Sequence, residues 1–233
     1  MNYSTLTIIT PTLNEADNIR ELIESLVNLY PDVFIIVADD GSNDGTQDRV
    51  LEINRFNKHI ILLDRKNEPV KGLTASIVDG ILKTQTKFFC VIDADLQHPP
   101  EVIGQIYDNL INGYDIVSGR RNPYKENQGL HRIIVTKIAT IIARIYFKIL
   151  KGFTVHDPMS GLFGGHTYLV QEIIKNSQKR FEPKGYKVLF DILKACPRGV
   201  NFKDILYQFR FRTGGQSKMS AKHGWYFLRG LLK

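Results

Sequence analysis

The sequence predicts an α/β protein whose mostly parallel sheet is flanked by helices. In residues 1–120, short runs rich in β-branched residues alternate with amphipathic stretches, which is typical of a parallel sheet covered on both faces. The expected strands are Leu6–Thr10, Val33–Asp39, His59–Leu63, Phe88–Asp93 and Asp115–Ser118. Between them, apolar residues that recur every three or four positions predict helices. These helices cover the stretch from Ile19 to Leu29, Thr46–Arg55, Gly72–Lys83 and Pro99–Asn112.

The second half of the chain predicts helices with basic faces. Residues 130–151 form one expected amphipathic helix, whose apolar positions are Ile134, Ile138, Ile141, Ile142, Ile145 and Ile149. A short strand within 156–165, helices near 167–176 and 185–195, and a strand near 201–212 are expected to follow. The tail at 220–233 is a further amphipathic helix, with aromatic residues beside Lys222 and Arg229. No repeat or linker divides the chain, so a single domain over 1–233 is expected.

The composition is that of a globular protein with an excess of basic residues. Of its 233 residues 43% are hydrophobic, enough to build a core. The net charge of +7 favours an anionic partner, which could be nucleic acid, acidic lipid or a phosphorylated substrate. Neither a signal peptide nor a membrane-spanning run of about 18 apolar residues is expected. Cys90 lies in an apolar run and is interpreted as a core residue, and it predicts no disulfide with Cys196.

Acidic residues follow three of the expected strands. The first strand ends in Pro11-Thr12-Leu13-Asn14-Glu15, the second in Asp39-Asp40-Gly41-Ser42, and the fourth in Asp93-Ala94-Asp95-Leu96-Gln97. Ligands of parallel sheets lie beyond the carboxyl ends of the strands, so these clusters are expected to meet at one edge. Carboxylates spaced as Asp93-x-Asp95 suit Mg²⁺ or Mn²⁺ bound to a nucleotide diphosphate, although the same pattern also occurs in solvated turns.

Six segments, in order, resemble the family 2 inverting glycosyltransferases, and among these the dolichyl-phosphate mannose synthases and their bacterial polyprenyl-phosphate relatives. They are the three strand-end clusters, Arg120, Asp157-Pro158-x-Ser160-Gly161 and Phe209-x-x-Arg212-x-x-Gly215-x-Ser217-Lys218. The resemblance covers nearly the whole chain. It implies a GT-A fold, in which a nucleotide-binding sheet works with a divalent cation, Mg²⁺ or Mn²⁺.

The resemblance also implies roles for individual residues. Asp93, Asp95 and Gln97 would surround the metal and the diphosphate. The full nucleotide-sugar set would be Pro11, Leu13, Glu15, Asp40, Lys71, Asp93, Ala94, Asp95, Gln97, Arg212 and Lys218. The chain departs from the family in two places. The family's Lys-x-Gly-Leu-Gly segment reads Lys71-Gly72-Leu73-Thr74, and the usual aromatic residue of the first motif is Leu13.

Basic residues predict how an acceptor would bind. A phosphate monoester is already ionised near pH 7, because its second pKa is about 6, so its attack requires cations and no general base. The expected cations are Arg120 and Arg132 for the acceptor phosphate, and Arg212 and Lys218 for a loop over the diphosphate. Together with Asp95 they form the expected catalytic set. For each cation the alternative is an ordinary surface charge.

Other polar residues near these segments have simpler interpretations. Arg121, Arg144 and Lys148 are interpreted as surface charges or contacts to lipid headgroups. Asp157 is expected to orient an arginine or the acceptor, or to shape a turn. His98 precedes two prolines and is interpreted as a structural cap or a contact to the sugar, outside the metal set.

The expected function is metal-dependent, inverting transfer of a hexose to dolichyl or polyprenyl phosphate, with GDP-mannose as first donor and UDP-glucose as second. Three alternatives remain. Transfer to a hydroxyl would need a carboxylate base, and a nucleic-acid-binding module would not suit the acidic edge. A non-catalytic scaffold would have no need of Asp93 and Asp95. Residues 1–120 would bind the nucleotide sugar, and 121–233 the acceptor and the membrane. The basic amphipathic segments predict a peripheral or C-terminally anchored protein at the cytoplasmic face of a membrane, with an anchoring subunit as a further partner and no nucleic acid.

Overall fold

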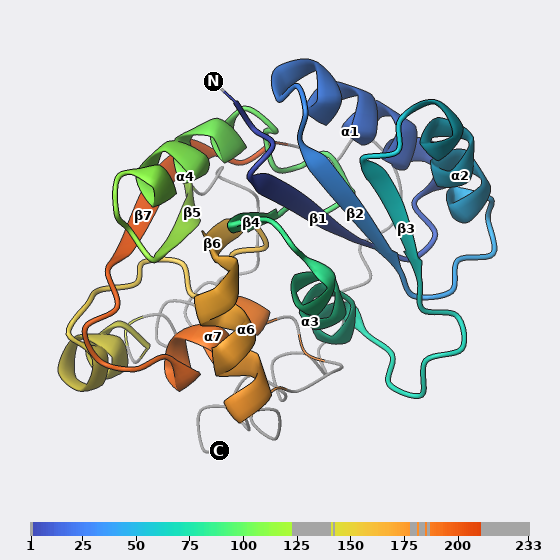
Figure 1. The fold of residues 1–233 in the computed structure, drawn as a ribbon. Coiled ribbons are helices and arrows are strands. Elements are labelled where there is room, and N and C mark those ends of the chain that lie inside the picture. Colours follow the sequence, from blue (N-terminus) through green and yellow to red (C-terminus); the bar gives the residue numbers. More distant parts are fainter. Residues whose placement is uncertain are drawn as a thin grey trace.

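The computed structural model describes residues 2–122, 141, 143–177, 181, 185 and 187–210. These residues form a seven-stranded sheet with helices on both of its faces (Figure 1). Most of the expected helix at 130–151, the end of the strand near 201–212 and the amphipathic tail at 220–233 lie outside the described residues. The same is true of three expected site residues, Arg132, Arg212 and Lys218.

The sheet is mostly parallel, as the sequence predicts. Its strands are β1 (Leu6–Thr12), β2 (Phe34–Asp39), β3 (Ile60–Asp64), β4 (Phe88–Val91), β5 (Ile116–Asn122), β6 (Phe163–His166) and β7 (Phe202–Gln208). They lie in the order β3-β2-β1-β4-β6-β5-β7. Strands β1 to β4 pair in parallel, as do β5 and β7. Strand β6 lies between β4 and β5 and is antiparallel to both, a position that the sequence did not predict.

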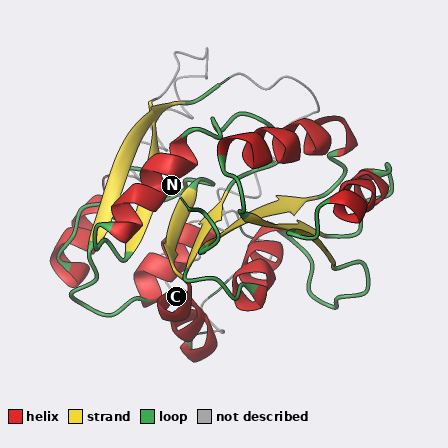
Figure 2. Ribbon diagram, turned by 45° about the horizontal axis from the view of Figure 1, so that its top comes forward, coloured by secondary structure: helices red, strands yellow, loops and turns green. Residues whose placement is uncertain are grey.

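The helices form one layer on each face of the sheet (Figure 2). They are α1 (Ala16–Leu29), α2 (Thr46–Phe56), α3 (Leu73–Lys83), α4 (Val102–Ile111), α6 (Thr167–Asn176) and α7 (Val188–Ala195). Helices α1, α2 and α4 bury residues in one hydrophobic cluster, and α3, α6 and α7 bury residues in a second cluster. Most of the expected α1 stripe is buried, but Leu29, in the last turn, is exposed.

Neighbouring strand residues contribute to opposite clusters. Ile8 belongs to the cluster of α1 and α4, whereas Ile9 belongs to the cluster of α3 and α7. Side chains alternate across a strand, so a strand covered on both faces buries residues at every position and is mostly apolar. This explains the apolar runs of β2 and β4, while β1 buries three threonines among its apolar residues. Cys90 is fully buried in the first cluster, which confirms its interpretation as a core residue.

Residues 143–151 are helical and turn their isoleucines outwards. Ala143 and Phe147 are fully buried, whereas Ile141, Ile145 and Ile149 are 53%, 54% and 67% exposed. The described part of the isoleucine stripe is therefore not the face that packs against the protein core. Among the residues that the structure describes, no helix has the length and apolar character needed to cross a bilayer.

Candidate active site

The expected acidic clusters meet at one edge of the sheet. Strands β1 and β2 are parallel with Thr12 opposite Asp39, and β4 runs parallel to β1 on its other side, so the carboxyl ends of all three lie together. The first two clusters are joined directly. The amide of Asn14 donates to Ser42 Oγ at 2.8 Å, and the amide of Asn43 donates to Asn14 Oδ1 at 3.0 Å. The convergence predicted from the strand ends is confirmed.

Asp39 anchors the loop that follows β2. Its carboxylate is fully buried and accepts hydrogen bonds from the amide of Ser42 at 2.8 Å, from Gln47 Nε2 at 2.7 Å and from Thr12 Oγ1 at 3.0 Å. The hydroxyl of Ser42 and the amide of Gly41 also donate to it. A buried carboxylate with this many donors from its own chain is a structural group, because losing any one would leave a buried polar atom unsatisfied.

Asp40 holds the loop after β3. One of its oxygens accepts from the buried guanidinium of Arg65, and the other accepts from the amide of Gly72 at 2.7 Å. Arg65 also donates to Asp79 at 2.7 Å, and Lys71 Nζ donates to the carbonyl of Arg65. The structure thus brings Asp40 and Lys71, two expected nucleotide-side residues, into one network. Arg65 at its centre was missed by the sequence analysis.

The segment from Pro11 to Glu15 leads from the end of β1 to the start of α1. Pro11 is buried and Leu13 is exposed beyond the end of β1. The amide of Glu15 lies 3.0 Å from Thr46 Oγ1, and Glu15 Oε2 accepts from the side chain of Asn18 at 3.0 Å. The motif is therefore fixed to the loop that follows β2.

The loop after β4 carries the expected metal-side residues. The Asp93 side chain is 31% exposed, Ala94 is buried, and Asp95 Oδ1 accepts from the amide of Gln97 at 3.2 Å. Leu96, between Asp95 and Gln97, has a φ of 60°. This left-handed backbone conformation costs energy for a residue other than glycine and is frequent at functional sites. The carbonyl of Gln97 accepts from the amide of Arg210 at 2.9 Å, so the loop is tied to the chain beyond β7.

This donor set suits a hard cation. Carboxylate and amide oxygens of Asp93, Asp95 and Gln97 lie on one short loop, and Mg²⁺ or Mn²⁺ prefers oxygen ligands. The described residues contain no group of three or more His, Cys, Asp or Glu side chains that could hold a metal by themselves. A cation that arrives with phosphate oxygens needs only one or two carboxylates. The residues therefore fit a metal that is shared with a diphosphate.

His98 is bonded to Asp93. The imidazole is almost fully buried, and its Nε2 lies 3.1 Å from Asp93 Oδ2 while its Nδ1 lies 2.6 Å from the hydroxyl of Tyr207 in β7. Burial raises the pKa of Tyr207 far above its ordinary value, so the hydroxyl keeps its proton. His98 is next to the metal-side residues in space as well as in sequence, and its carboxylate contact was not among the expected roles.

The segment after the helix at 143–151 supplies a further contact to Asp93. A side chain at Gly161 would overlap Asp93 Oδ2, so glycine at this position leaves the carboxylate where it lies. Asp157, at the start of the same motif, accepts from Arg121 Nε at 2.7 Å and from Arg121 Nη2 at 2.9 Å. Of the roles expected for Asp157, the structure supports the orientation of an arginine.

Arg120 and Arg121 have different environments. Arg121 is held by Asp157; burial alone would lower its pKa, but the hydrogen bonds and charge of Asp157 raise it. Its interpretation as a surface charge or a contact to lipid headgroups did not foresee this pairing, in which two charge-assisted hydrogen bonds hold a partly exposed guanidinium. Arg120 points to the opposite face of β5, since side chains alternate along a strand, and it is partly exposed. Asp204 lies on that same face, where it accepts from Ser118 and from His156 Nδ1 at 2.6 Å.

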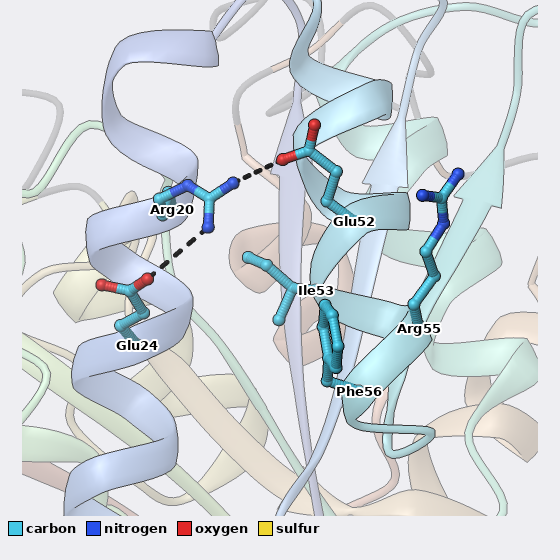
Figure 3. Close-up of a pocket in the computed structure, with 6 residues that line it drawn as sticks. All are labelled: Arg20, Glu24, Glu52, Ile53, Arg55 and Phe56. Atoms are coloured by element: carbon cyan, nitrogen blue, oxygen red, sulfur yellow. Dashed lines mark hydrogen bonds and ion pairs between the residues drawn. The ribbon is translucent and has the colours of Figure 1, made fainter.

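A surface hollow of about 480 Å³ lies elsewhere, between α1 and α2 (Figure 3). It is lined by Arg20, Glu24, Glu52, Ile53, Arg55 and Phe56. Arg20 bridges the two helices and forms ion pairs with Glu52 at 2.6 Å and with Glu24 at 3.7 Å. No residue expected from the sequence to bind a ligand lines this hollow, so the edge formed by the strand ends is the better candidate site.

The fold and the edge define an α/β protein with polar side chains gathered at the carboxyl ends of its parallel strands. Residues 7–174 match the model of the family described as "Glycosyl transferase family 2". The chain therefore belongs to glycosyltransferase family 2, and the resemblance noted in its motifs is confirmed.

Curated relatives match almost the whole chain. A dolichol-phosphate mannosyltransferase from Pyrococcus furiosus is 31% identical over 98% of this chain, which spans 63% of the length of that relative. The dolichol-phosphate mannosyltransferase of Saccharomyces cerevisiae is 27% identical, with 92% of this chain and 81% of that protein aligned. A polyprenol monophosphomannose synthase from Mycolicibacterium smegmatis is also 27% identical, over 93% of this chain and 81% of its own length.

Solved structures share the fold. A glucosyl-3-phosphoglycerate synthase from Mycobacterium tuberculosis, in complex with Mn²⁺, UDP-glucose and phosphoglyceric acid, superposes with a TM-score of 0.70 at 20% identity. The match covers 97% of this chain and 78% of that one. At this identity the likeness concerns the fold alone, and it confirms the GT-A architecture that the motifs predict.

Proposed function

We propose that this protein transfers a hexose, with mannose from GDP-mannose as the first choice, to the phosphate of a dolichyl or polyprenyl phosphate. The observation that carries the proposal is the edge of the sheet. There the loop from Asp93 to Gln97 follows β4, and His98 contacts its first carboxylate. Arg120, near the end of β5, is proposed to complete the site. The names of the curated relatives support the choice of sugar and acceptor.

The donor side is proposed to use a divalent cation, Mg²⁺ or Mn²⁺. Asp93, Asp95 and Gln97 would hold it together with the diphosphate of the donor. Bound there, the cation supplies positive charge that offsets the charge of the leaving nucleoside diphosphate. The Mn²⁺ bound to the mycobacterial synthase supports this assignment. The remaining nucleotide-sugar contacts are assigned to Pro11, Leu13, Glu15, Asp40, Lys71 and Ala94.

The acceptor side is proposed to use cations and no general base. Arg120, with Arg132, would hold the lipid phosphate close to the anomeric carbon, while Arg212 and Lys218 would offset the charge of the diphosphate. An acceptor phosphate oxygen forms the new bond to the anomeric carbon as the bond from that carbon to the diphosphate oxygen breaks. One displacement of this kind inverts the anomeric centre, so an α-linked donor gives a β-linked product.

Contact with a membrane is part of the proposal. Ile141, Ile145 and Ile149 form an exposed apolar stripe, and Lys148 is exposed between them. Such a helix can place its apolar residues in the interface while its lysine meets anionic headgroups. We assign the protein to the cytoplasmic face of a membrane, with an anchoring subunit as a further partner. Residues 121–233 would form the acceptor half of a single domain and 1–120 the nucleotide-sugar half.

A substrate panel tests the proposal. The purified chain is offered GDP-mannose or UDP-glucose, each with a short polyprenyl phosphate or the free polyprenol, in Mg²⁺, Mn²⁺ or excess chelator. We expect transfer from GDP-mannose to the phosphate only, with either metal and not with chelator, and a β-linked product by proton NMR. Transfer to the free alcohol would contradict the phosphate acceptor, and turnover in chelator would contradict the metal requirement. An α-linked product would contradict the single inverting displacement.

A further inference from the structure

We infer that His98 and Tyr207 form a buried brace that sets the orientation of the Asp93 carboxylate. The last strand of the sheet, β7, would thereby position the metal-side carboxylate at the end of β4. This inference rests on the proposed function, because it is there that Asp93 is assigned to the cation.

The brace is a row of three polar groups. The Tyr207 hydroxyl lies 2.6 Å from His98 Nδ1, and His98 Nε2 lies 3.1 Å from Asp93 Oδ2. A neutral imidazole has one donor nitrogen and one acceptor nitrogen. When the tyrosine hydroxyl donates to Nδ1, the Nε2–H is the donor that faces the carboxylate. Both contacts are then satisfied, so the hydroxyl of Tyr207 selects the tautomer that holds Asp93.

The surrounding packing leaves this row little freedom. His98 is 2% exposed and Tyr207 is 6% exposed. A side chain at Gly119 would come within 2.7 Å of the Tyr207 ring. Phe209 packs edge-on against the imidazole, with ring centroids 5.1 Å apart. Glycine at 119 makes room for the tyrosine ring, as glycine at 161 does for the carboxylate, so residues from separate segments enclose both ends of the row.

Strand β7 supports the metal-side loop at two points. Tyr207 reaches Asp93 through His98, and two residues past the end of the strand the amide of Arg210 donates to the carbonyl of Gln97 at 2.9 Å. Partners of this kind, which contact a ligand but not the metal, typically change metal affinity about 10- to 100-fold when they are removed. The brace is a positioning device, because neither His98 nor Tyr207 is assigned a contact to the substrate.

The test removes a single oxygen atom. Tyr207→Phe keeps the ring and deletes the hydroxyl that faces His98. The matched control is Tyr107→Phe, which deletes a partly buried hydroxyl bonded to Thr5 Oγ1 at 2.7 Å and to the carbonyl of Asn2 at 3.0 Å, near the start of β1. Mn²⁺ affinity is measured by electron paramagnetic resonance in the presence of GDP and, in parallel, of UDP. We expect the Kd for Mn²⁺ to rise about tenfold in Tyr207→Phe and to stay unchanged in Tyr107→Phe.

A double-mutant cycle separates the brace from a general loss of structure. If the hydroxyl acts through the carboxylate, Tyr207→Phe should have no further effect on Mn²⁺ affinity once Asp93 is replaced by Asn. His98→Asn should behave like Tyr207→Phe in the same cycle. An effect of Tyr207→Phe that persists in full beside Asp93→Asn would overturn the brace.

The remaining outcomes distinguish the two proposals. Unchanged Mn²⁺ affinity in Tyr207→Phe, together with a large loss in Asp93→Asn, would overturn the brace and leave the proposed metal site standing. Wild-type protein that binds neither nucleotide more tightly with Mn²⁺ than without it would overturn the metal assignment, and the brace with it.

Discussion

The two acidic clusters after β2 and β4 both place aspartates at a strand end, but their surroundings differ. Asp39 receives its hydrogen bonds from the chain on several sides and is fully buried. Asp93 receives a contact from His98 on one side and remains partly exposed. Carboxylates that follow β2 and β4, the strands on either side of β1, can thus differ in role: Asp39 is a structural anchor and Asp93 is a proposed ligand. The difference lies in burial, because the chain encloses Asp39 completely whereas 31% of the Asp93 side chain stays exposed.

The largest expected effect is a loss of activity on substitution in the cluster after β4, which is the proposed metal site. Asp95→Asn should lower kcat/KM for sugar transfer roughly 10²–10³-fold, because it removes a charge from the proposed metal site. The melting temperature should stay close to that of the wild type, since Asn can still accept the hydrogen bond from the amide of Gln97. Initial rates and thermal unfolding of the same preparation check both expectations. A folded Asp95→Asn protein with normal turnover would remove Asp95 from the site.

Substitution of Asp39, in the cluster after β2, should lower the stability of the folded protein. Asp39→Ala leaves the amide of Ser42 and the side chain of Gln47 without their acceptor, and should lower the free energy of unfolding by about 3 kcal/mol. Urea denaturation measures this change. The control is Asp48→Ala in the exposed first turn of α2, for which we expect less than about 1 kcal/mol. Equal effects of the two substitutions would mean that Asp39 is not an anchor.

Adjacent arginines on β5 extend the comparison to the acceptor side. Arg120→Ala should raise KM for the lipid phosphate about tenfold with nucleotide affinity unchanged, because it removes one charge-assisted contact. Arg121→Ala should instead lower stability by about 1 kcal/mol, since Asp157 loses its partner. Steady-state kinetics and calorimetry with nucleotide distinguish them. Lost nucleotide binding in Arg120→Ala would move this residue to the donor side.

The smallest expected effect is a change in how the stability of the protein depends on pH. Burial by itself raises the pKa of Asp44, but hydrogen bonds from Thr46 and Ala16 outweigh it and hold the pKa below its ordinary value of 3.8. A carboxyl with a depressed pKa in the folded state stabilises the protein above its unfolded pKa, and this stabilisation is lost as the pH falls through the folded value. Asp44→Asn should therefore lose slightly less stability than the wild type between pH 6 and pH 3. Urea midpoints at several pH values report the difference, and identical pH profiles would contradict it.

Much of the fold could be predicted because local patterns determine it. The spacing of Ile19, Leu22, Ile23 and Leu26 indicates α1 because a helix buries one stripe. The position of β6 could not be predicted in this way. Its sequence, Phe163-Gly164-Gly165-His166, has little strand propensity, and Gly164 is fixed as glycine by its close approach to β4. A side chain at Gly164 would come within 2.6 Å of the carbonyl of Phe89, a neighbour that the sequence does not reveal.

Some residues of the candidate site could likewise be predicted from the sequence, and others could not. Asp40 and Asp93 were predicted because they directly follow apolar strands. Arg65 and Tyr207 were missed because their partners lie far away in the sequence, 25 positions for the ion pair to Asp40 and 109 for the contact to His98. Only the folded chain places these groups together. An arginine in the loop after β3 and a tyrosine in an edge strand have no distinctive signal of their own.

The position of β6 has a consequence for how the chain folds during synthesis. Strands β1 to β4 have partners among themselves and can pair once all four have been synthesised, but one edge of β4 must wait for residues 163–166. Strand β5 waits longer, because its partners are β6 and β7. Until then a nascent chain exposes an apolar, unpaired strand edge, which is the feature that drives aggregation of folding intermediates. The carboxylate loop after β4 would thus gain its support from β7 only in the last stage of folding.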